Sequence, residues 1–138
     1  MTSMVRRARH SAHLATLFVV GTLLWSASGI AEPATLEGTW SGGGTVVYPS
    51  GERERARCRA TFTRRSANRF NMNAVCATPS ARVAQTAVLA RASDNRFTGE
   101  FFNPEYSVSG AIAITVRGNR LNASLSGGGG TGYFNLSR

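Results

Sequence analysis

The fold is decided by residues 52–78, which read ERERARCRATFTRRSANRFNMNAVCAT. From Arg53 to Arg59 an arginine occupies every second position. In the second half of the stretch polar and apolar residues alternate with the same period of two, as in Arg69-Phe70-Asn71-Met72-Asn73-Ala74. A period of two is typical of β-strands, so we predict strands at 52–63 and 69–78 joined by a short turn around Ala67. The stretch is therefore a hairpin with one arginine-rich face.

The register of this hairpin brings together the two cysteines of the chain. If the strands turn symmetrically about Ala67, Cys58 lies opposite Cys76 on the apolar face. Cross-strand Cβ atoms lie about 4.5–5.5 Å apart, so slight local closing allows a disulfide. A loop of roughly 18 residues closed in this way stabilises a fold by about 3 kcal/mol in the chain-entropy model. The chain has no CxxC motif or Cys/His cluster, which disfavours a redox or metal role.

The alternation continues along the rest of the chain. Glycine, proline, asparagine and aspartate separate eight runs, at 38–48, 52–63, 69–78, 82–92, 96–102, 106–116, 120–126 and 131–138. Short alternating runs with turn residues between them predict an all-β fold, a single antiparallel eight-stranded meander. Closure into an up-and-down barrel removes exposed strand edges, so we expect a closed barrel with one disulfide.

Strand parity assigns most of the barrel interior. A first hairpin symmetric about Ser50 places Trp40 opposite Ala60, and the inner face then includes Val46, Phe62, Phe97, Phe101, Val108, Ile112, Ile114, Val116, Leu121, Leu125, Phe134 and Leu136. The run 82–92 is apolar on both faces, so its sides stay unassigned. Eight-stranded barrels are either filled by side chains or hold one small ligand. Many inner residues are glycine or alanine; we favour a flattened, filled barrel over one with a modest cavity.

The beginning of the chain is typical of export. Three arginines among the first nine residues precede an uncharged apolar run from Leu14 to Trp25, and small residues lead to Ala31. This layout predicts a cleavable signal peptide at 1–31. The apolar run is too short for a spanning helix, which needs about 20 residues. We therefore expect one small β-barrel domain at 32–138, periplasmic or secreted, with no transmembrane segment after cleavage and with conditions that favour the disulfide.

The composition of the exported part argues against catalysis. Both histidines lie in the signal segment, which removes the commonest general base and metal ligand. Lysine is absent, which excludes Schiff-base chemistry, and paired cysteines leave no thiolate nucleophile. No two of the carboxylates at 52, 54, 94, 100 and 105 share an evident inner site. We predict a non-enzymatic protein with no catalytic residues, no cofactor and no metal.

Four arginines form the most distinctive surface of the predicted barrel. Arg53, Arg55, Arg57 and Arg59, here called the arginine strip, share the outer face and have small or neutral lateral neighbours. Each guanidinium is a planar fork suited to phosphate, sulfate or carboxylate. The strip is either an anion-binding site, which the arginines at 64, 65 and 69 would extend, or ordinary solvated surface whose stems cover apolar atoms. Glu52 and Glu54 have inner parity at the barrel mouth, but we expect a strand start near Arg55 and solvated carboxylates.

The first strand also carries a family resemblance. Gly38-Thr39-Trp40 resembles the Gly-x-Trp motif of calycin-type barrels, the lipocalin and avidin superfamily, although the lipocalin helix is missing. In that family a basic residue near the last strand covers the tryptophan, so the resemblance implies a structural pair of Trp40 and Arg138. The chain also resembles a group of small exported bacterial proteins with no assigned activity, which implies export and a barrel.

Charge completes the functional expectations. Residues 32–138 carry 13 arginines and seven acidic residues, and an exported basic protein attracts anionic partners. Our leading hypothesis is an anionic envelope component, such as anionic lipid, lipopolysaccharide or an acidic polymer, bound by the arginine strip. The alternatives are a calycin-like carrier of a small apolar ligand and a periplasmic hydrolase inhibitor. Nucleic acid is disfavoured, because few aromatic residues interleave with the arginines.

Overall fold

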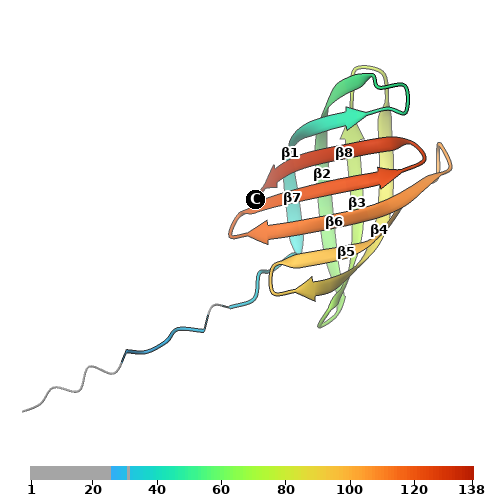
Figure 1. The fold of residues 1–138 in the computed structure, drawn as a ribbon. Helices are drawn as coiled ribbons and strands as arrows, with labels where there is room; N and C mark the ends of the chain where they lie inside the picture. Colours follow the sequence, from blue (N-terminus) through green and yellow to red (C-terminus); the bar gives the residue numbers. More distant parts are fainter. Residues whose placement is uncertain (1–25, 31) are drawn as a thin grey trace, which may run out of the picture. The chain divides into compact units, whose positions relative to one another are not determined.

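Eight antiparallel strands form a closed barrel in the computed structural model, which describes residues 26–30 and 32–138 (Figure 1). The strands are β1 (Gly38–Val47), β2 (Arg53–Ser66), β3 (Arg69–Ala77), β4 (Arg82–Ser93), β5 (Arg96–Asn103), β6 (Val108–Arg117), β7 (Arg120–Gly127) and β8 (Gly130–Ser137). Each pairs with its neighbours in sequence, and β1 pairs with β8 to close the barrel. The predicted all-β meander and its closure are confirmed. Most of the predicted signal peptide lies outside the described residues. Among the described residues, no helix is long and apolar enough to cross a membrane.

The two registers expected at the start of the chain are those of the structure. Trp40 pairs with Ala60, and Cys58 pairs with Cys76, to which it is joined by a disulfide. The strand that the sequence left unassigned, β4, turns Val83, Gln85, Ala87 and Leu89 inward and Arg82, Ala84, Thr86 and Val88 outward. The apolar residues on its outer face therefore contribute surface rather than core.

Two inward-facing glycines allow the barrel to close tightly between β1 and β8. A Cβ atom added at Gly42 would lie 2.1 Å from the carbonyl oxygen of Asn135, and one at Gly44 would lie 2.1 Å from that of Tyr133. Any side chain here would therefore collide with the β8 backbone. The two glycines therefore allow the β1 and β8 backbones to pack against each other where the barrel closes.

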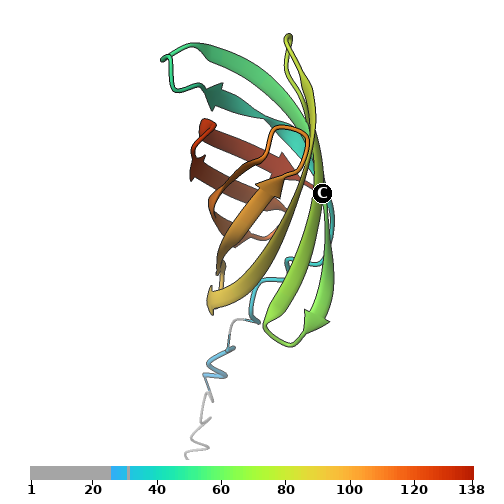
Figure 2. The same cartoon turned by 90° about the vertical axis from the view of Figure 1, so that its right-hand side faces the viewer.

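The two ends of the barrel differ. One end, here called the mouth, is formed by the loops 48–52, 78–81, 104–107 and 128–129. Figure 2 shows the β1–β2 and β3–β4 loops together at this end. The half of the interior away from the mouth is filled by side chains with almost no exposed surface, namely Leu36, Trp40, Phe70, Leu89, Phe97, Ile114, Val116 and Leu121. The filled barrel that the sequence favoured is thus correct for this half only.

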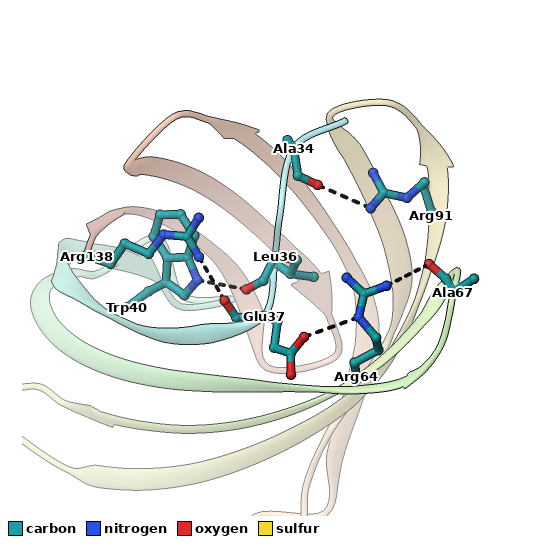
Figure 3. A network of polar contacts seen from close by, with 8 residues as sticks. All are labelled: Ala34, Leu36, Glu37, Trp40, Arg64, Ala67, Arg91 and Arg138. Carbon is teal, nitrogen blue, oxygen red and sulfur yellow. Dashed lines mark hydrogen bonds and ion pairs between the residues drawn. The ribbon is translucent and has the colours of Figure 1, made fainter. Parts of the chain in front are cut away.

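The segment Ala34–Glu37, here called the strap, covers the end of the barrel opposite to the mouth (Figure 3). The side chain of Leu36 is fully buried, and its carbonyl accepts a hydrogen bond of 2.9 Å from Nε1 of Trp40. The N–H of Ala34 donates to the carbonyl of Asp94 at 3.0 Å. Through these bonds the strap becomes part of the core, although it precedes the first strand.

Three arginines, from β2, from β4 and from the residue after β8, hold the strap, and each lies over an aromatic ring. The guanidinium carbons lie 4.2 to 5.2 Å from the ring centroids, in the pairs Arg64–Phe70, Arg91–Phe97 and Arg138–Trp40. Each also donates a hydrogen bond to the strap, Arg64 to the Glu37 carboxylate, Arg91 to the Ala34 carbonyl and Arg138 to the Glu37 carbonyl. A cation over a ring contributes about 0.5–1 kcal/mol at exposed sites. Because all three arginines also bond to the strap, their contacts form one small network.

This network corrects one expectation about the arginine strip. Arg64 does not extend the strip, because it is an even-numbered residue of β2 and therefore lies on the parity opposite to that of Arg53 to Arg59. Its Nε donates to Oε2 of Glu37 at 3.2 Å, and its Nη1 donates to the carbonyl of Ala67.

Candidate functional site

The mouth half of the barrel contains a pocket of about 640 Å³. Its walls are mainly apolar and come from inward-facing positions of the surrounding strands, with Val46, Cys76, Val83, Phe101, Val108, Leu125 and Phe134 among them. Small-molecule sites typically have volumes of about 300–1,000 Å³, so this pocket has room for one small ligand. The filled opposite half leaves the mouth as its entrance.

One polar side chain inside the pocket lacks a hydrogen bond. Gln85 lies on the inner face of β4, where it pairs with Ala74 of β3. Its Oε1 is buried and has no hydrogen-bond partner among the described residues. A buried acceptor without a donor costs about 1–3 kcal/mol. A donor group on a bound molecule would remove that cost.

Glu54 joins two loops of the mouth. Its Oε2 accepts hydrogen bonds from Ser80 Oγ at 2.7 Å and from Tyr48 Oη at 2.8 Å. The hydrogen bond from Ser80 has the largest effect in holding the pKa of Glu54 below its ordinary value, and the hydroxyls of Thr78 and Tyr48 act in the same direction. Glu54 is therefore ionised at neutral pH, and its carboxylate ties the β1–β2 loop to the β3–β4 loop.

The position of Glu54 differs from the sequence expectation. We expected β2 to begin near Arg55, but the strand begins at Arg53 and carries Glu54 on its inner face. Glu52 is exposed, as expected, and lies at the edge of the pocket. The partner Ser80 is 26 residues away on another loop, so its contact with Glu54 depends on barrel closure and could not be read from the local pattern.

A third loop of the mouth is fixed by Asn103. This side chain is 5% exposed, and its Oδ1 accepts hydrogen bonds from the backbone N–H groups of Glu105 and Tyr106. The Asn-Pro pair at 103–104 gave a sequence signal for this turn, because asparagine side chains stabilise turns in this way. The turn leaves the Tyr106 ring half exposed at the rim of the pocket.

The arginine strip lies on the outer surface, with the lateral neighbours expected from parity. All four guanidinium-bearing side chains are exposed, and Arg57 lies between Gly43 of β1 and Ala77 of β3. Within the described residues the ion pair of the structure joins Arg64 to Glu37, and no acidic side chain pairs with the strip. The register adds one residue that the sequence missed, Arg82, which lies across Ala77 from Arg57. Arg82, Arg57 and Arg59 line a second pocket.

The other candidate residues have structural positions. The Cys58–Cys76 disulfide borders the pocket through Cys76, and the described part of the chain contains no free cysteine. Arg138 lies over the ring of Trp40, at the end of the barrel away from the pocket. No group of three histidine, cysteine or acidic side chains within the described ranges is placed to hold a metal ion.

No family model matches this chain, and no curated protein matches it. Several solved structures are similar to it in fold. A redesigned barrel, mFAP1 bound to DFHBI, has a TM-score of 0.64 and 16% identity over 75% of this chain and 94% of its own. A fluorescence-activating barrel designed de novo has a TM-score of 0.61 and 12% identity over 79% of this chain and 99% of its own. The chain thus has the fold of these small eight-stranded antiparallel β-barrels.

Proposed function

We propose that this protein is an exported, non-enzymatic carrier that holds one small, largely apolar molecule in the mouth half of its barrel. The observation that carries this proposal is the pocket of about 640 Å³ with apolar walls. The buried, unpartnered Oε1 of Gln85 supports it, because ligand sites combine apolar walls with a few polar groups that orient the ligand.

Three further observations support parts of the proposal. The basic and apolar segments before residue 32 favour export, and a disulfide suits an oxidising compartment. Membership of the calycin superfamily is proposed from the Gly38-Thr39-Trp40 motif and the arginine over the tryptophan ring. The redesigned barrels mFAP1 and mFAP0, which are similar in fold, are bound to DFHBI.

A neutral apolar dye tests the pocket. Nile red is expected to bind the protein with one site per chain, and Val83→Trp is expected to weaken binding at least tenfold, because the indole fills the pocket. Val88→Trp is the matched control, since the same change on the same strand faces outward, where Val88 is 47% exposed. Fluorescence titration measures both. Equal loss in the two variants, or no binding by the unaltered protein, would reject the carrier.

The arginine strip supports a second candidate function, attachment to an anionic envelope component. The supporting observation is the row of exposed guanidinium groups on β2 that form no ion pair with the part of the chain that the structure describes, and Arg82 extends this row across β3. Such groups bind phosphate in pairs of parallel hydrogen bonds. Attachment through the outer face of β2 leaves the mouth free, so the two functions are compatible.

Vesicle binding tests the strip. The protein is expected to bind phosphatidylglycerol vesicles but not phosphatidylcholine vesicles. The affinity should fall steeply between about 50 and 500 mM salt, because the distance over which charges attract is roughly 10 Å at 0.1 M salt and shortens as salt is added. Changing the strip to glutamine should abolish binding. The matched control changes Arg96, Arg117 and Arg120, which are also exposed but lie on other strands, and it is compared with a strip variant in which Arg55, Arg57 and Arg59 are changed, so that both variants lose the same charge. If both variants lose binding equally in a sedimentation assay, net charge rather than the strip is responsible.

A further inference from the structure

The pocket is acidic although the protein is basic. Residues 32–138 carry 13 arginines and seven acidic residues. Of the described residues that line the pocket, none is arginine, whereas Glu52 and Glu54 both belong to its rim. The charged side chains that line the pocket are therefore opposite in sign to the net charge of residues 32–138.

Two hydrogen-bond acceptors of the pocket have no donor within the described residues, and a third is an ionised carboxylate. The two hydrogen bonds from Tyr48 and Ser80 to the Glu54 carboxylate both go to Oε2, and the Thr78 hydroxyl and the Ser80 backbone add further favourable contacts to the same carboxylate. The carboxylate of Glu52 and the Oε1 of Gln85 accept no hydrogen bond within the described residues. The hydroxyls of Tyr48 and Ser80 are already donating to Glu54. A ligand that enters the pocket thus meets two carboxylates and an amide oxygen to which it can donate hydrogen bonds.

We infer that the pocket selects amphiphiles with a positively charged head group, such as a protonated amine, over neutral and anionic amphiphiles of the same shape. This inference rests on the carrier function proposed above. The apolar body lies between Phe101, Leu125 and Phe134, and the amine lies at the rim against Glu54 and Glu52. The exposed ring of Tyr106 offers a further favourable contact, because cations are attracted to aromatic faces.

The same geometry disfavours fatty acids. A carboxylate head at the rim would lie beside two carboxylates, and like charges repel in a partly desolvated site. A neutral alcohol can donate to one acceptor but gains no charge attraction. The expected order of affinity is therefore amine, alcohol, carboxylate.

A matched series of ligands tests the order. Decylamine, decanol and decanoate are titrated at about pH 7, below their micelle concentrations, into the exported chain by isothermal calorimetry. The amine is expected to bind at least tenfold more tightly than decanoate. Because hydrogen bonds to charged groups are strong, the Glu52→Gln/Glu54→Gln variant should lose roughly tenfold to hundredfold in amine affinity. Its affinities for decanol and decanoate should stay level or rise.

Two controls separate local charge from other effects. Glu100→Gln removes the same kind of charge from the exposed outer face of β5 and is expected to keep the order of affinity. Glu105→Gln removes the same kind of charge from the 104–107 loop of the mouth, outside the lining of the pocket, and is also expected to keep it. An order of affinity that persists in the Glu52→Gln/Glu54→Gln variant would overturn the inference.

The remaining outcomes distinguish this inference from the carrier function. If all three ligands bind equally, or decanoate binds best, and Val83→Trp abolishes binding, the carrier function stands and the cationic preference is wrong. If no ligand binds, or Val83→Trp has no effect on any of them, the carrier function itself fails.

Discussion

Replacing Trp40 with alanine is expected to lower the free energy of unfolding by about 3–5 kcal/mol, the range for large-to-alanine changes in a core. The side chain is fully buried, and Nε1 provides the hydrogen bond to the carbonyl of Leu36. The substitution therefore leaves a cavity, removes the donor for a buried carbonyl and takes the ring from beneath Arg138. Small domains are stable by about 5–15 kcal/mol, so this single change removes a large share.

Urea denaturation followed by far-UV circular dichroism, which does not depend on tryptophan fluorescence, measures the loss. Trp40→Phe keeps an aromatic ring but removes the N–H, and is expected to cost less than the alanine substitution. Arg138→Met keeps the aliphatic stem over the ring but removes the cation, and should cost about 1 kcal/mol. If Trp40→Ala costs no more than Arg138→Met, the tryptophan is not a central element of this end of the barrel.

The strap makes a large effect of Trp40 plausible on structural grounds. The three arginines contact the segment 34–37 from β2, β4 and the residue after β8. Removing the ring of Trp40 weakens the position of Leu36 and of Arg138 together. Contacts that share partners are not additive, so the costs of the single substitutions do not sum to the cost of removing the whole network.

The antiparallel fold was predictable because each hairpin is encoded locally. The pairing of Trp40 with Ala60, and that of Cys58 with Cys76, follows from symmetry about a single turn residue, and the structure has both registers. β4 was the exception, since Val83 faces the pocket whereas Val88 faces solvent. A strand with small apolar residues on both faces has no alternation to read, so only its neighbours determine which face is inside.

The strap and the mouth were not predictable for a different reason. Leu36 is the one large apolar side chain in the short stretch at 32–37 before the first strand, and it belongs to no periodic pattern. Glu54 finds Ser80 only after β2, β3 and β4 have been placed side by side. Both features depend on contacts between elements that are distant in sequence, whereas parity describes one strand at a time. The pocket itself results from how these elements leave the mouth half unfilled.

The disulfide provides the second large expected effect. Changing Cys58 and Cys76 together to alanine is expected to lower the free energy of unfolding by about 3 kcal/mol, because the cross-link limits the freedom of the unfolded chain. The bond closes a loop with a sequence separation of 18. For a domain of this size the melting temperature should fall on the order of 10–20 °C.

Two measurements show whether the disulfide stabilises the protein by restricting its unfolded chain. The dependence of unfolding free energy on urea concentration should steepen in the alanine variant, because an unlinked chain exposes more surface when it unfolds. Reduction of the unaltered protein should lower its melting temperature by a similar amount, whereas the alanine variant should not respond to reductant. Nile red binding should persist, because the barrel keeps its register without the cross-link. A loss of binding at temperatures where the variant is folded would instead show that the disulfide shapes the pocket wall that Cys76 forms.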